Sequence, residues 1–265
     1  MKVPAAKPLA ALALSLAGIV AIPAAASAHG APGHGHGGGG SAPPDAAQVY
    51  ITHGLPLDDH GTVVDVWAGP AGSGPAGAAQ LLDNFSFGQS DGPYDLAPAT
   101  YSVFLAAPDS EEDDDVLTAD EVIYSQDLAV PADANVSVVA SLTEAGAPTL
   151  AAFVNDVSAT PRNAGRLSIR HAAAAPPVNV TLGLAPFSRW APGLFSTTVG
   201  PAANGQQADL VLPKWRYDVS VSVASSGAPV AGVEDLKVRR DALTNVYAVG
   251  VPGSTFQFVV QTIRF

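Results

Sequence analysis

The chain has 265 residues, no cysteine, and 24 acidic against 12 basic residues, which gives a formal net charge of −12. Without cysteine it can form no disulfide and offers no thiolate as a nucleophile or a metal ligand. The acidity argues against nucleic acid and anionic lipid headgroups as partners, because both repel a negatively charged protein.

The first 28 residues have the organisation of a secretory signal peptide. Two lysines precede an apolar run over residues 9–22, and the small-residue stretch AAASA at 24–28 ends in a cleavage site. The run is too short for a spanning helix, which needs about 20 apolar residues. We therefore predict cleavage after Ala28, an extracellular mature chain, and no stable membrane insertion after cleavage.

A leader over residues 29–47 follows, rich in Gly, Pro, Ala and His and without any apolar period, which predicts a flexible segment. After cleavage, His29 would offer both its imidazole and its α-amino group to one ion. Together with His34 and His36 it would form a nitrogen-rich set suited to copper or zinc. The leader is therefore either a metal chelator or a simple tether.

From residue 48 onward, short alternating runs are rich in β-branched and aromatic residues and are bounded by Pro, Gly, Asn or Asp, as is typical of β-strands. No window of comparable length keeps a helical period, so the chain is predicted to be all-β. In the first half the predicted strands are 49–52, 62–67, 100–106, 122–130, 135–142 and 149–157.

The second half of the chain repeats the first. The matching stretches, second half first, are 167–171 with 49–53, 178–183 with 64–69, 212–221 with 97–105, 233–238 with 125–130, and 245–251 with 135–141. Each copy has the size of an immunoglobulin-like β-sandwich of roughly seven strands. We predict two tandem antiparallel sandwiches, over residues 48–160 and, in a degenerate copy, over residues 165–265.

Several stretches of the first copy resemble the secreted bacterial family known as domain of unknown function 4397. They are VYITHGLP at 49–56, VDVW at 64–67, NFSFGQSDGPYDLAPATYSV at 84–103, and the DLAV strand that ends at Val130. The second copy keeps His171, Val178, Val180, Pro213 and Tyr217, whereas Asn179 stands in place of Asp65. The resemblance implies tandem immunoglobulin-like sandwiches outside the cell and no established activity.

The stretch GQSDG at 88–92 fits the G-x-S-x-G pattern, which in hydrolases places the serine on a strand-to-helix turn. Here Pro93 follows and no helix is predicted. A triad of Ser90 with Asp127 and His171 would need partners from two different sandwiches. A secreted serine hydrolase at Ser90 is therefore the least favoured alternative, and we predict that the chain is not an enzyme.

His53 and His171 end the first strand of each copy and share parity with apolar residues of their strands. A histidine in that place faces the rim of a core, where it is usually hydrogen-bonded and structural. One histidine per sandwich cannot by itself form a metal site.

Residues 109–121 contain eight acidic residues among thirteen. Carboxylates in a loop can supply the oxygen ligands of calcium, with Asp113, Asp115 and Asp120 as the ligands to test. The stretch lacks the glycine of an EF-hand turn and connects two predicted strands. A solvated, self-repelling loop is the simpler interpretation.

Two of the three tryptophans are candidates for ligand stacking. Trp67 shares parity with Asp65, opposite two valines, and Trp190 lies in the loop PFSRWAPG at 186–193. An exposed aromatic ring can stack on a sugar or anchor a protein partner, and packing in a core or rim is the alternative.

These features favour a non-catalytic secreted or cell-surface module that binds a cell-wall polymer or an extracellular protein and is held noncovalently at the wall. The alternative is an extracellular copper- or zinc-handling protein that uses the histidine leader, with the acidic loop as a calcium site.

Copper(II) titration calorimetry distinguishes a chelating leader from a tether. For a tether, a chain starting at His29 and one starting at Ser41 are expected to bind copper equally weakly. Tight one-to-one binding confined to the longer chain would instead establish chelation, with His29, His34 and His36 as the residues to substitute.

Overall fold

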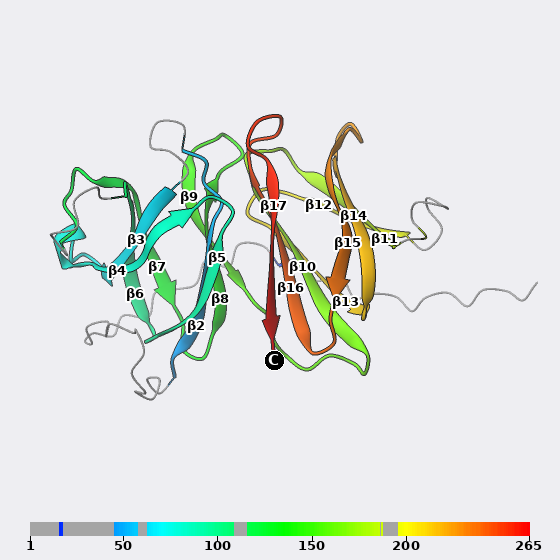
Figure 1. Cartoon of the computed structure of the whole chain (residues 1–265), viewed down its shortest axis with the longest axis horizontal. Coiled ribbons are helices and arrows are strands. Elements are labelled where there is room, and N and C mark those ends of the chain that lie inside the picture. Colours follow the sequence, from blue (N-terminus) through cyan, green and yellow to red (C-terminus); the bar gives the residue numbers. More distant parts are fainter. Residues whose placement is uncertain (1–15, 18–44, 58–62, 109–115, 186, 188–195) are drawn as a thin grey trace, which may run out of the picture.

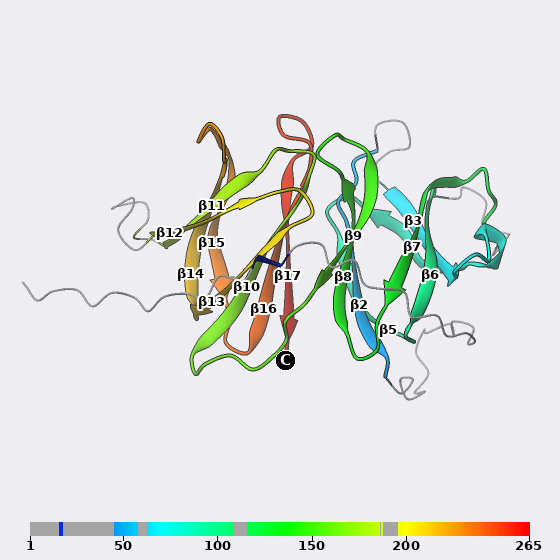
Figure 2. The same cartoon turned by 180° about the vertical axis from the view of Figure 1, so that it is seen from behind.

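A computed structural model describes residues 16–17, 45–57, 63–108, 116–185, 187 and 196–265. These residues form the predicted all-β architecture of two sandwiches, each made of two four-stranded sheets built from long strands (Figure 1). Seen from both sides, the sheets lie as successive layers (Figure 2). We call the two sheets that face each other across the middle the inner sheets, and the other two the outer sheets.

The first sandwich contains strands β2 to β9. Its inner sheet has the order β5 (Ser90–Leu96), β2 (Ala47–His53), β8 (Asn135–Leu142), β9 (Pro148–Val154). Its outer sheet has the order β4 (Ala79–Ser86), β3 (Val63–Pro70), β6 (Ala99–Ala106), β7 (Val122–Val130), and a 3-10 turn, η1 (Pro75–Gly77), follows β3.

The second sandwich repeats this topology strand for strand. Its inner sheet has the order β13 (Gln207–Pro213), β10 (Ala164–Ala173), β16 (Ala242–Gly250), β17 (Gln257–Arg264). Its outer sheet has the order β12 (Ser196–Ala202), β11 (Val178–Leu184), β14 (Trp215–Val223), β15 (Pro229–Val238). A two-residue strand, β1 (Leu16–Ala17), lies within the predicted signal peptide and pairs with the edge of β13.

The strand registers correct one of the predicted repeat matches. In each inner sheet the first strand runs parallel to the strand beside it, with His53 opposite Ala140 and His171 opposite Ala248. Ala248 is therefore the equivalent of Ala140, and Asn135 corresponds to Leu243 rather than to Asn245. The predicted match of 245–251 with 135–141 was wrong by two residues, an even shift that leaves every side chain on its correct face.

Five strands of the structure were not predicted: the two-residue β1 and the longer strands β4, β5, β12 and β13. All of these strands except β13 lie at the edge of a sheet. β13 is separated from the edge of its sheet only by the short β1. Two of them contain Gly-Pro pairs, Gly92-Pro93 and Gly200-Pro201, which usually mark loops. Pro is tolerated at an edge because it needs no ladder partner there. Gly92 has φ 118°, and a β-carbon on it would lie 2.8 Å from the Val49 carbonyl oxygen, so glycine is required.

Each sandwich has its own apolar core between its sheets, and the two cores are fixed by equivalent tyrosines. The Tyr101 hydroxyl donates to the Ala97 carbonyl at 2.9 Å, and the Tyr217 hydroxyl donates to the Pro213 carbonyl at 2.9 Å. A buried phenol that bonds back to the chain four residues upstream is the tyrosine corner of immunoglobulin-like sandwiches.

The inner sheets pack against each other through a further apolar cluster. Its buried members from both sandwiches are Val139, Phe153, Ala172, Tyr247, Val249 and Val259. A hydrogen bond from Gln261 Nε2 to Ser90 Oγ at 2.9 Å crosses the same interface. Another runs from Asn204 Nδ2 to the Leu142 carbonyl at 2.9 Å. The two sandwiches are therefore joined by a buried, mixed interface rather than by the chain alone.

Arg170 of β10 lies at the centre of this interface and is 0% exposed. Its guanidinium donates to Asn155 Oδ1 at 2.6 Å, to the Tyr247 hydroxyl at 2.8 Å and to Gln207 Oε1 at 3.1 Å. It also lies 5.0 Å from the ring centroid of Phe153. Burial lowers the pKa of Arg170, and the neighbouring Tyr247 opposes that shift. Since Asn155 and Phe153 belong to the first repeat, this side chain bonds the repeats together.

Replacing Arg170 with alanine is expected to lower the free energy of unfolding by about 3 kcal/mol, because several buried acceptors lose their donor at once. Urea unfolding followed by intrinsic fluorescence measures the change. Arg162→Ala, which removes an exposed arginine between the sandwiches, is the control and should leave the free energy unchanged. A fully stable Arg170→Ala protein would show that the apolar cluster alone holds the interface.

Candidate functional site

Charge is divided sharply between the two repeats. Residues 47–161 contain 18 acidic residues and neither lysine nor arginine. From Arg162 to the last residue there are ten basic and five acidic residues. The net charge of the whole chain therefore hides a second repeat that is basic.

An open groove of about 830 Å³ lies at one end of the second sandwich, beside the chain end marked C in Figure 1. Its volume is in the range of ligand sites, roughly 300–1,000 Å³. The lining residues come from the start of β14, the end of β15, the β15–β16 turn and the end of β17: Lys214, Trp215, Lys237, Val238, Arg239, Arg240, Asp241, Ala242, Arg264 and Phe265. Five of these ten side chains are cationic, so the groove is a concentration of positive charge on an acidic protein.

Trp215 is the largest exposed apolar side chain in the groove, at 54% exposure. It lies two residues before the buried Tyr217 and so faces the same side of β14, just beyond the end of the core. Its indole Nε1 donates to the Ala185 carbonyl at 3.1 Å, which restrains the ring. The groove therefore presents an oriented aromatic surface among cations.

Most of the groove cations carry uncompensated charge. Arg240 Nε lies 3.0 Å from Asp241 Oδ2, and both side chains are more than half exposed. Within the part of the chain that the structure describes, the other groove cations, Lys214, Lys237, Arg239 and Arg264, have no carboxylate within ion-pair distance. They are available to an anionic ligand.

The first repeat has the same turn without the cations. Asp133 and Asp241 occupy equivalent positions with φ values of 53° and 50°, so the turn has the same conformation in both copies. The registers give the equivalents of Lys214, Trp215, Lys237, Arg239, Arg240 and Arg264 as Pro98, Ala99, Ala129, Pro131, Ala132 and Asp156. Because the fold forms without these side chains in the first copy, they are not needed for folding in the second.

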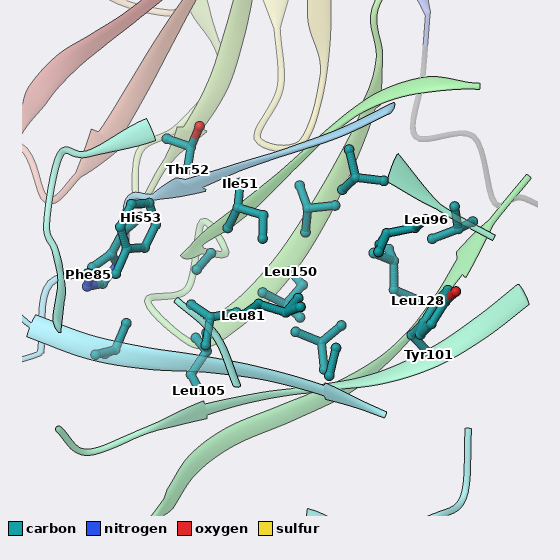
Figure 3. A pocket seen from close by; sticks show the side chains of 18 residues that line it. Ile51, Thr52, His53, Leu81, Phe85, Leu96, Tyr101, Leu105, Leu128 and Leu150 are labelled. Carbon is teal, nitrogen blue, oxygen red and sulfur yellow. The ribbon is translucent and has the colours of Figure 1, made fainter. Parts of the chain in front are cut away.

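A second cavity lies inside the first sandwich and is only about 30 Å³ (Figure 3). It is enclosed by core side chains that include Ile51, Leu105 and Leu150 from both sheets. A space of that size holds about one or two water molecules, and an apolar cavity of this kind stays dry. It is a packing gap rather than a ligand site.

His53 and His171 are buried and are 1% and 3% exposed. The His53 ring stacks on Phe85 with centroids 5.9 Å apart, and its Nε2 has no hydrogen-bond partner among the described residues (Figure 3). Burial lowers the pKa of His53 to about 4. Burial also lowers the pKa of His171, whose Nε2 lies 3.1 Å from the Pro176 carbonyl oxygen. Both rings are therefore neutral packing elements.

Ser90 is the first residue of β5 and belongs to the interface between the sandwiches. Its hydroxyl lies 2.9 Å from Thr52 Oγ1 and accepts the hydrogen bond from Gln261. Asp127 is occupied elsewhere, since it accepts from Ser102 Oγ at 2.6 Å. Ser90 therefore makes hydrogen bonds that stabilise the interface, and within the described residues it makes none with Asp127 or His171.

Of the other predicted site residues, only Trp67 and Asp120 belong to the described part of the chain. His29, His34, His36, Asp113, Asp115 and Trp190 lie outside the described residues. Asp120 is exposed at the turn before β7. Within the described ranges, no group of three histidine, aspartate or glutamate side chains is arranged to hold a metal ion. The metal predictions at the leader and the acidic loop therefore stay predictions.

Trp67 faces the outside of its sheet, as its parity predicts, but it is covered. It is 8% exposed and packs in a small cluster with Phe104, Ala106 and Leu117. Leu117 comes from the segment before β7, a covering that strand parity cannot reveal. In this arrangement Trp67 offers no open ring face for stacking.

The groove itself was missed by the sequence analysis. The acidic total obscured it, although counting charge separately in each repeat would have shown the basic second copy. The pair Arg239-Arg240 stands directly in the alignment opposite Pro131-Ala132. No sequence pattern shows that the ends of β14, β15 and β17 meet to form the groove.

Comparison with known proteins gives a family. A family model described as Domain of unknown function (DUF4397) matches residues 47–181, from β2 into β11. No protein with a curated description matches the chain. Within the described residues, no helix is long and apolar enough to span a membrane.

Several solved structures are similar to the chain at low identity. The fimbrial anchor protein Mfa2 from Porphyromonas gingivalis is 10% identical with a TM-score of 0.24, over 83% of this chain and 98% of that one. A candidate adhesin from Bacteroides ovatus is 9% identical with a TM-score of 0.24, over 83% of this chain and 95% of that one. Similarity at this level carries no functional argument.

Because the pKa of His53 lies at about 4 in the fold and near 6.5 in the unfolded chain, the unfolded chain binds more protons between these pH values. The contribution of His53 to stability is therefore highest above pH 6.5 and falls as the pH drops toward 4. This histidine alone is expected to cost about 3 kcal/mol of unfolding free energy over that range. Titration of the imidazole signals by NMR, beside urea unfolding at each pH, measures both quantities. A His53 ring that titrates near pH 6.5 would contradict its burial.

Proposed function

Because the chain belongs to the family of the Domain of unknown function (DUF4397), which supplies a relationship but no activity, we propose its function from the groove. The protein is a non-catalytic extracellular interaction module that binds an anionic partner through the basic end of its second sandwich. The family match agrees with the resemblance expected from the VYITHGLP and VDVW stretches.

The observation that carries this proposal is the difference between two copies of one fold. The first copy builds the same turn with Pro131 and Ala132, whereas the second has Arg239 and Arg240 there. Clustered like charges repel one another and destabilise a fold unless a ligand offsets them. Cations that folding does not require and that an acidic protein gathers in one groove are best explained by an anionic ligand.

The rest of the molecule supports a binding role over catalysis. The buried histidines are neutral packing groups, Ser90 is part of the interface, and the cavity of the first sandwich is too small for a substrate. The interface around Arg170 joins the sandwiches through buried contacts, which suits a spacer that presents one end to a partner. Secretion through the predicted signal peptide and noncovalent attachment to the cell wall complete the proposal.

The test measures the binding of a folded chain that starts at residue 41. Its targets are three immobilised anionic polymers, namely polygalacturonate, polyphosphate and polyglutamate, and uncharged dextran is the blank. At least one polymer is expected to bind, with affinity that falls steeply with salt. The variant Lys237→Ala/Arg239→Ala/Arg240→Ala should weaken binding at least tenfold and lower the salt slope by about 3, one unit for each lost contact.

The matched control is Arg216→Thr, which introduces the residue of the first repeat at the equivalent position. Arg216 is exposed on β14 but is already paired with Asp235 and does not line the groove. It should leave binding nearly unchanged. If no anionic polymer bound, or if the control weakened binding as much as the triple variant, the groove would not be the binding surface.

A further inference from the structure

The groove combines charge with one oriented aromatic ring, and this combination narrows the class of partner. We propose that the ligand is an acidic polysaccharide, with one sugar ring stacked on Trp215 and its anionic groups paired with the surrounding cations. This inference rests on the proposed function, since it names the partner of the same groove.

Trp215 is an exposed aromatic side chain that the first repeat lacks. Its position in the first repeat is held by Ala99, and the tyrosine corner two residues later is unchanged, so the indole is not needed to close the sandwich. A ligand that covers the exposed part of a tryptophan removes apolar surface from water, which is favourable. Its hydrogen bond to Ala185 leaves the ring restrained while one part remains open to solvent. A restrained, half-open indole is suited to stacking on the apolar face of a sugar.

Several cations line the groove around the Trp215 ring. Lys214 precedes Trp215 in the chain, and Val238, which is paired with Trp215 across the ladder, is flanked by Lys237 and Arg239. Lys214, Lys237 and Arg239 line the same groove as Trp215, so the ring lies among cations. A polymer that alternates sugar rings with carboxylate, phosphate or sulfate groups matches this arrangement, whereas a polymer without rings would leave Trp215 unused.

A folded protein partner fits the groove less well. Interfaces between proteins are depleted in lysine and depend on a central apolar anchor cluster. Here the exposed large apolar side chains of the groove are Trp215 and Phe265, set among five cations. The acidic first sandwich adds a directional effect, because it repels a polyanion everywhere except at the basic end.

Calorimetry with soluble oligomers of six units each tests the sugar contact. The probes are hexagalacturonate, hexaglutamate, inorganic hexapolyphosphate and uncharged maltohexaose. Hexagalacturonate should bind tightest, and Trp215→Ala, which brings in the residue of the first repeat, should weaken it about tenfold, the loss expected for one aromatic contact. The same variant should leave polyphosphate and polyglutamate binding unchanged. Trp215→Phe should restore most of the affinity because it keeps a ring.

The outcomes separate this inference from the proposed function. Equal affinity for all anionic probes, insensitive to Trp215→Ala but abolished by the triple groove variant, would overturn the sugar contact and leave an anion-binding groove. Concentration-dependent self-association in sedimentation velocity, lost in the triple variant, would overturn it in favour of a second copy whose acidic sandwich fills the groove. Failure of every probe would overturn both proposals.

Discussion

The packing of the two inner sheets is the constraint on which the rest of the structure depends. Arg170 has to be buried with its charge satisfied, and part of that requirement is met by reaching Asn155 and Phe153 across the boundary. Neither sandwich can separate without exposing an apolar cluster and leaving polar atoms unpaired. Duplication alone would give two independent modules; this interface gives one body with two ends.

That single body makes the difference between its ends meaningful. The copies share topology, the tyrosine corner and the conformation of the turn at Asp133 and Asp241. They differ in charge, because the first has no lysine or arginine and the second gathers cations around Trp215. A duplicated fold contains its own comparison: what both copies keep serves the fold, and what one copy alone acquired is free to serve a ligand.

Strand parity, turn residues and the internal repeat predicted the all-β class, two sandwiches and the inward direction of His53 and His171. They failed where the local signal was weak, as in β5, whose Gly92-Pro93 pair is allowed only because the strand lies at an edge. They also failed where the decisive contact was distant. The covering of Trp67 by Leu117, the crossing of Arg170 to Asn155 and the meeting of strand ends at the groove all depend on tertiary structure. The missed groove is of this kind, because its lining residues extend from Lys214 to Phe265 and are separated by up to 51 positions in the chain.

The position of the groove follows from how a sandwich is built. Along the sheets, inward side chains fill the core and outward ones face solvent or the other sandwich, so neither face of the inner sheet is free. At an open end, the residue after the last core layer keeps an inward direction but is only partly covered, as Trp215 is beyond Tyr217. Turns at that end bear long side chains without disturbing a ladder. New binding chemistry can therefore appear at such an end at small cost to stability. A charged side chain on the face of a sheet is the opposite case, because Arg170 is buried there and needs the whole surrounding interface to satisfy its charge.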